Sequence, residues 1–173
     1  MAPGGANFCT RVLMRPSSFR LSFRISIPAL LFALVFLLPG VALLLAAPNL
    51  DPIWLMFLFG FIFAAAGAGL LLFWTQPVVF DRSRGYYWRG WRRFADITRD
   101  AKRSARLDDI VAIQLLGEHV TDSDGDSYTS YELNLVLKSG ERVHVVDHGS
   151  HTRISKDADT LAAFLKVPLR KHP

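Results

Sequence analysis

The amino-acid sequence predicts a membrane protein built from an α-helical hairpin and one small α+β domain. Two segments, 25–50 and 52–80, contain no charged side chain, and about 20 apolar residues let a helix cross the hydrocarbon core of a bilayer. The remaining chain is polar, with apolar residues that alternate as in half-buried strands. We therefore expect a basic N-terminal arm (1–24), a two-helix transmembrane hairpin (25–75) and an α+β domain (76–173).

The two apolar segments are joined by a short turn, so their helices should run antiparallel. Asp51 is expected to cap the second helix and Pro52 to occupy its first position. Neither segment contains the ionisable side chains that ion-coupled transporters usually need at membrane depth. The hairpin is therefore predicted to serve as an anchor.

Small residues recur along the second helix at every fourth position, at Gly60, Ala64 and Ala68. Such a face lets two helix backbones approach closely. Its partner is either the first helix of the same hairpin or a second copy of the chain in a homodimer.

Basic residues flank the hairpin on both sides. Arg11, Arg15, Arg20 and Arg24 precede it without an acid among them, and residues 81–106 hold nine basic and three acidic residues, a net charge of +6. The connecting turn has no Lys or Arg and one acid, Asp51. Because cytoplasmic flanks of membrane spans carry an excess of Lys and Arg, both termini should be cytoplasmic.

The domain is predicted to be an antiparallel sheet of about five strands followed by one C-terminal amphipathic helix. The strands are expected at 78–81, 86–88, 110–120, 131–137 and 142–146. Gly85 and Gly140 lie in the turns of the two predicted hairpins.

Ser155 is the expected N-cap of the C-terminal helix, with Asp157 and Asp159 in its first turn. Pro168 should end this helix. Its apolar stripe comprises Ala158, Leu161, Ala162 and Leu165.

This order of elements, with residues 78–82, 107–110 and the 131–146 hairpin, resembles small bacterial membrane proteins that fuse two transmembrane helices to a pleckstrin-homology-like domain. The resemblance covers about residues 25–168 and rests on patterning. It implies a curved sheet plugged by the C-terminal helix, a non-catalytic scaffold or binding role and a location in the bacterial inner (plasma) membrane. Five strands are few for a complete domain of this kind, and the resemblance supplies no functional residues.

Aromatic rings and arginines alternate just after the second apolar segment, at Trp88, Arg89, Trp91, Arg92 and Arg93. Anionic headgroups attract basic residues beside a span, and indole rings favour the interface. We expect these five residues to contact the lipid surface; the alternative is plain hairpin packing with solvated charges. The position beside a membrane argues against nucleic acid as the partner.

Two clusters contain residue types that bind metals. His144, Asp147 and His148 lie close together, but Gly149 breaks the segment and no second ligand motif supports them. Asp122, Asp124 and Asp126 resemble a calcium loop whose glycine, Gly125, stands at the wrong position. We therefore expect no metal and no other cofactor.

The sequence contains no nucleophile motif, phosphate-binding glycine loop or dinucleotide fingerprint. It favours a membrane-anchored, non-catalytic interaction or scaffold protein whose cytoplasmic domain contacts lipid or a protein partner. The alternatives are an accessory subunit of a larger membrane complex and a metal-dependent enzyme that uses His144, Asp147 and His148.

Overall fold

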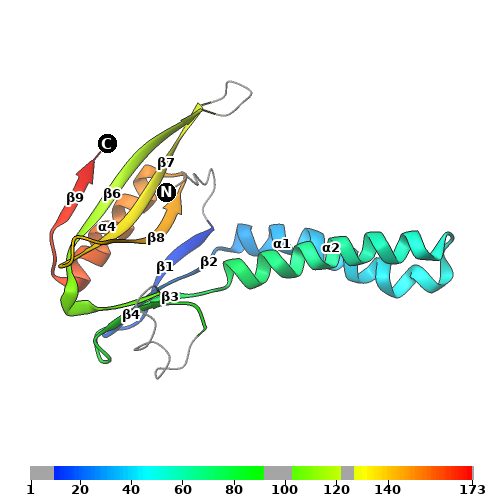
Figure 1. Cartoon of the computed structure of the whole chain (residues 1–173), viewed down its shortest axis with the longest axis horizontal. Coiled ribbons are helices and arrows are strands. Elements are labelled where there is room, and N and C mark those ends of the chain that lie inside the picture. The colour runs from blue at the N-terminus through cyan, green and yellow to red at the C-terminus, as the bar shows by residue number, and fades with distance from the viewer. Residues whose placement is uncertain (1–9, 92–102, 122–126, 173) are drawn as a thin grey trace. The chain divides into compact units, whose positions relative to one another are not determined.

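The computed structural model describes residues 10–91, 103–121 and 127–172. The chain forms two compact units (Figure 1). One is the helical segment 25–76, and the other combines residues 1–24 with 77–173.

The helical unit consists of α1 (Ile27–Ala46), the 3-10 turn η1 (Ala47–Asn49) and α2 (Ile53–Trp74). Both helices are long and apolar enough to span a membrane, and they pack side by side. Ser26 caps α1, since its Oγ accepts a hydrogen bond from the backbone N–H of Ala29 at 3.3 Å. The expected cap at Asp51 is wrong: Pro52 holds the N-cap position of α2, and no side chain caps this end.

Glycine brings the two helix backbones together. A Cβ atom on Gly40 would lie 2.3 Å from the backbone nitrogen of Ala64, and one on Gly67 would lie 2.4 Å from that of Leu37. Gly60 similarly faces Leu44. Two of the small residues identified in the sequence, Gly60 and Ala64, therefore face α1, whereas Ala68 is half-buried; homodimerisation stays a prediction.

The first sheet of the other unit has five strands in the order β1-β2-β3-β4-β5. The strands are β1 (Arg11–Ser17), β2 (Arg20–Ile25), β3 (Val78–Asp81), β4 (Tyr86–Arg89) and β5 (Ser104–Arg106). The structure differs here from the separate basic arm expected at residues 1–24. β2 pairs antiparallel with β3. This pairing buries the apolar side chains of Leu21 and Phe23, each 1% exposed, in the core of the domain.

The second sheet has the order β8-β7-β6-β9. Its strands are β6 (Ile110–Thr121), β7 (Ser127–Leu137), β8 (Arg142–His148) and β9 (Leu169–His172). Both predicted hairpins are confirmed, with Gly85 and Gly140 at positive φ in their turns. The predicted strands are shared between two sheets, however. The helix is also not the last element, since β9 follows it and pairs parallel with β6.

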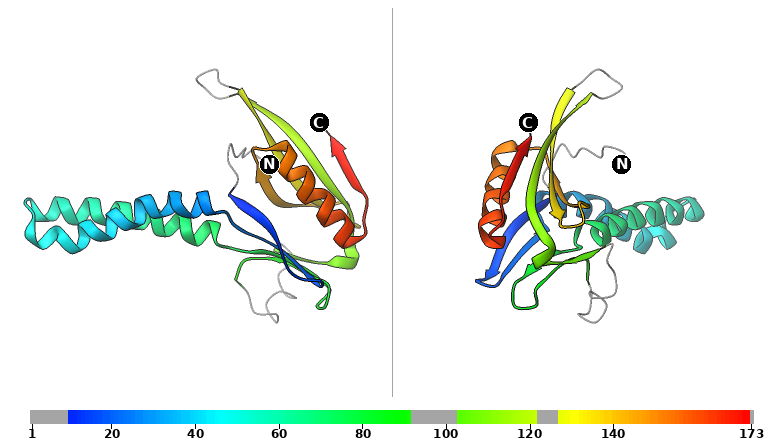
Figure 2. Two further views of the ribbon diagram at one scale, coloured as in Figure 1. Left: turned by 180° about the vertical axis from the view of Figure 1, so that it is seen from behind. Right: turned by 60° about the vertical axis from the view of Figure 1, so that its left-hand side comes forward.

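The helix α4 (His151–Leu165) lies along one face of the second sheet (Figure 2). Its N-cap is Ser150, five residues earlier than expected, so Ser155 is a helical residue and not the cap. Lys166 ends the helix in a left-handed conformation two residues before Pro168. The buried face of α4 joins a single core with both sheets; its members are Ile154, Ala158, Leu161 and Phe164.

Candidate interaction site

The hairpin leaves and rejoins the domain at one row of strand ends in the first sheet. In an antiparallel sheet the starts of β1, β3 and β5 lie beside the ends of β2 and β4, and we call this row of strand ends the junction edge. The cross-strand partners Phe23, Val78 and Arg89 mark it. Ser26 alone separates β2 from α1, and three residues separate α2 from β3.

The structure divides the residues expected at the lipid surface. Successive residues of β4 point to opposite faces of the sheet, so Trp88 pairs with Val79 on one face. Trp88 is only 6% exposed, and the guanidinium of Arg20 stacks on its ring at 5.6 Å. Trp88 is therefore a packing residue that offers little surface to headgroups.

Arg89 and Trp91 have different surroundings. Arg89 is half-buried, and its Nη2 donates a hydrogen bond to the carbonyl oxygen of Val145 at 2.6 Å. Trp91 is 75% exposed. Arg92 and Arg93 lie outside the described residues, as do Asp122, Asp124 and Asp126 of the acidic loop.

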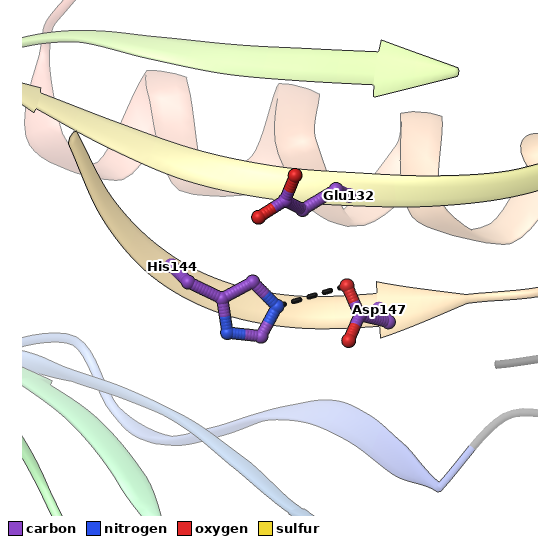
Figure 3. A group of neighbouring side chains, drawn as sticks. All are labelled: Glu132, His144 and Asp147. Atoms are coloured by element: carbon purple, nitrogen blue, oxygen red, sulfur yellow. Dashed lines mark hydrogen bonds and ion pairs between the residues drawn. The ribbon is translucent and has the colours of Figure 1, made fainter. Parts of the chain in front are cut away.

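A second polar cluster forms on β7 and β8, where Glu132, His144 and Asp147 converge (Figure 3). Each offers a ligand atom within 4.8 Å of the others, and His144 Nε2 lies 2.9 Å from Asp147 Oδ1. Glu132 and Asp147 are direct cross-strand partners. Carboxylates placed opposite each other repel, so this pair needs positive charge nearby.

An irregular register explains why the sequence did not reveal this cluster. Leu133 pairs with Val146 but Asn134 pairs with His144, so Val145 is an extra residue in β8. This bulge puts His144 and Asp147 on one face. The predicted grouping of His144, Asp147 and His148 is therefore wrong in its third member, and Glu132 takes that place.

His148 is turned into the domain instead. It is 3% exposed, and its Nδ1 accepts a hydrogen bond from the backbone N–H of Ser150 at 2.8 Å. Burial, followed by the nearby charge of Arg153, lowers the pKa of His148. The ring therefore favours its neutral form and supports the turn before α4.

Two arginines supply positive charge beside the cluster. Arg89 Nη2 lies 3.3 Å from His144 Nδ1. Arg11 is 8% exposed. Burial and then the charge of Arg89 lower the pKa of Arg11, while Tyr87 and Asp147 oppose this change. Burial likewise raises the pKa of Tyr87. The cluster thus joins both sheets through side chains.

The tautomer of His144 argues against a metal. A guanidinium can only donate, so Nδ1 of His144 must accept from Arg89 and Nε2 must carry the proton that faces Asp147. A metal at Nε2 would move that proton to Nδ1, where it would face a cation. The arrangement fits a hydrogen-bonded polar network better than a metal centre.

We accordingly expect no stoichiometric metal in the purified protein. Arg89 already donates to Nδ1 of His144, the atom that would have to act as a hydrogen-bond donor if a metal bound Nε2. Elemental analysis checks this. One zinc per chain, lost in His144→Ala but retained in the exposed control His151→Ala, would contradict it and favour the metal-dependent enzyme.

Two carboxylates elsewhere in the domain have shifted pKa values. Burial would raise the pKa of Asp81, but hydrogen bonds from Ser83, Arg20 and the N–H of Arg84 outweigh it and lower the pKa. On α4, burial raises the pKa of Asp157 to about 6 against a smaller opposing effect of Lys156. The folded domain therefore stabilises the ionised form of Asp81 and disfavours that of Asp157.

In comparisons with known proteins, no family model and no curated protein matches this chain. The function is therefore inferred from the residues and contacts described above.

Proposed function

We propose that this chain is a membrane-anchored, non-catalytic interaction protein. Its hairpin crosses the bilayer, and its domain contacts lipid headgroups or a protein partner on the cytoplasmic side. The observation that supports this most is the insertion of the hairpin between two paired strands, β2 and β3, of the domain.

This insertion gives the domain two short tethers. One is Ser26 between β2 and α1, and the other is Thr75–Gln76–Pro77 between α2 and β3. A domain held by two short connections explores fewer orientations than a domain on one flexible linker. Such an attachment favours a role that depends on presenting a fixed surface.

The insertion also restricts the topology. β2 and β3 belong to one folded sheet, so both ends of the hairpin must leave the bilayer on the same side. The flanking arginines favour the cytoplasm for that side. The charge-free helices argue for anchoring over ion transport.

Reporter fusions test this topology. We expect a fusion at residue 50 to lie outside the cytoplasm, and fusions at the C-terminus and in the Ser139–Gly140 turn to lie inside, because only the connecting turn lacks basic residues. A C-terminus on the same side as residue 50 would contradict both the hairpin and the cytoplasmic domain.

An accessory subunit of a larger complex is the second candidate, and one feature of α2 favours it. Ala65 and Gly69 are exposed and four residues apart, and a Cβ atom on Gly69 would meet nothing within 4 Å. This small-residue face is open to another helix. Copurification in mild detergent separates the candidates, since a subunit brings a stoichiometric partner that Gly69→Leu removes.

A further inference from the structure

Four of the five strands of the first sheet have an arginine at the junction edge. β1 starts with Arg11, β2 ends beside Arg24, β4 ends with Arg89, and Arg103 precedes β5. The described residues of this edge include no Asp or Glu. Backbone hydrogen bonds fix their proximity: Arg89 N donates to Arg103 O at 2.9 Å, and Gly90 N donates to Pro77 O at 2.8 Å.

Exposure separates these arginines by role. Arg11 is buried, and Arg89 is held by Val145. Arg24 and Arg103 are exposed, and so is the indole of Trp91, which follows the end of β4. Two guanidinium groups and one aromatic ring are thus accessible at this edge.

The strand ends opposite the junction edge are basic too, but most of their cations have other contacts. Arg82 contacts the backbone carbonyl and the ring of Phe164, and three other arginines lie near acids. Arg20 binds Asp81 at 2.7 Å, Arg84 lies 4.0 Å from Asp81, and Arg106 lies 3.5 Å from Asp108. Within the described part of the chain, no ion pair joins Arg24 or Arg103 to an acid. Within the described residues, Arg24 and Arg103 thus remain available to an anionic partner, whereas Arg20, Arg82, Arg84 and Arg106 already have partners in the domain.

We infer that the junction edge binds anionic lipid headgroups, with Arg24 and Arg103 on phosphate groups and Trp91 at headgroup level. This inference rests on the proposed function and specifies its lipid partner. Guanidinium groups bind phosphate oxygens in a bidentate manner. Indole rings favour the same interface.

The short connections between the junction edge and the two helices support lipid as its partner. Arg24 is three residues before the start of α1. Pro77 is three residues after the end of α2, which spans about 11 Å at most. If the helices cross the bilayer, the edge cannot leave the neighbourhood of the headgroups, whatever the orientation of the domain.

Full-length protein in nanodiscs provides the test. The relative association of spin-labelled phosphatidylglycerol and phosphatidylcholine is measured by electron paramagnetic resonance for wild type, Arg24→Gln/Arg103→Gln and the control Arg84→Gln/Arg106→Gln. The control removes the same charge from the opposite edge. We expect wild type to prefer phosphatidylglycerol. Arg24 and Arg103 should each contribute about a fivefold preference at low salt.

The preference should persist in the control and weaken in high salt. Equal losses in both double variants would overturn the inference in favour of a general charge effect. An unchanged preference in Arg24→Gln/Arg103→Gln, or none in wild type, would also overturn it. The reporter fusions are independent of lipid preference: if they give the expected topology, only the lipid assignment fails, whereas a C-terminus outside the cytoplasm defeats the proposed function itself.

Discussion

A soluble domain that joins residues 10–24 directly to 77–173 is expected to fold, whereas residues 77–173 alone are not. The reason lies in β2, whose Leu21 and Phe23 belong to the core and whose backbone pairs with β3. Without β1 and β2, the core side chains of β3 are exposed to solvent. The backbone of β3 also loses its hydrogen bonds to β2. Both losses leave apolar or polar groups without the contacts that folding requires.

The sheet also shows how to make the soluble form. Phe23 is the cross-strand partner of Val78, so the ends left by removing the hairpin are adjacent. A short Asn-Gly-containing turn between Arg24 and Pro77 should therefore replace residues 25–76 without strain. We expect cooperative thermal unfolding of this variant and no cooperative transition for the fragment 77–173.

Point substitutions in the joined variant sharpen this prediction. Phe23→Ala should lower the free energy of unfolding by about 3–5 kcal/mol, because it empties a fully buried site. Phe19→Ala is the matched control: the ring of Phe19 is 62% exposed, and its loss should change stability by about 0.5 kcal/mol or less. Urea titration measures both. A loss of stability in Phe23→Ala as small as that expected of the control would show that β2 is dispensable. Cooperative unfolding of the fragment 77–173 would show the same.

Local patterns in the sequence predicted most elements of the domain but not their partners. The hairpin at 131–146 was recognisable because Leu133, Leu135 and Leu137 alternate before a Ser-Gly turn. The sequence of β2, Arg-Leu-Ser-Phe-Arg-Ile, does alternate polar and apolar residues, but the run is short and merges with the charge-free segment that begins at residue 25. Its partner β3 also lies beyond the hairpin, with residues 26–77 between the two strands, and a periodicity argument does not detect pairing over that distance.

The same limit applies to β9 and to the polar cluster. The sequence of β9 is Leu-Arg-Lys-His, and it joins the sheet through backbone hydrogen bonds to β6, which side-chain patterns do not report. In β8 a bulge shifts the alternation by one residue, which exchanges the faces of the residues beyond it. Arginine burial at position 11 depends on the fold of both sheets and has no local signal.

Substitutions at two neighbouring glycines of α2 should have opposite effects on the hairpin. Gly67→Ala places a methyl group 2.4 Å from the backbone nitrogen of Leu37, closer than atoms can approach. α1 and α2 must then separate, and overpacking of this kind costs about 1–3 kcal/mol. Gly67→Leu should cost more, because it adds further atoms beyond the Cβ that already meets the backbone of Leu37.

Gly69→Ala is the matched control two residues away in the same helix. A Cβ atom there meets nothing within 4 Å, and alanine is a better helix former than glycine by up to about 1 kcal/mol. Reversible unfolding in SDS, followed by circular dichroism, should therefore show Gly67→Ala below wild type and Gly69→Ala at or above it. Equal destabilisation of both variants would mean that glycine acts in α2 through the general properties of the helix and not through contact with Leu37.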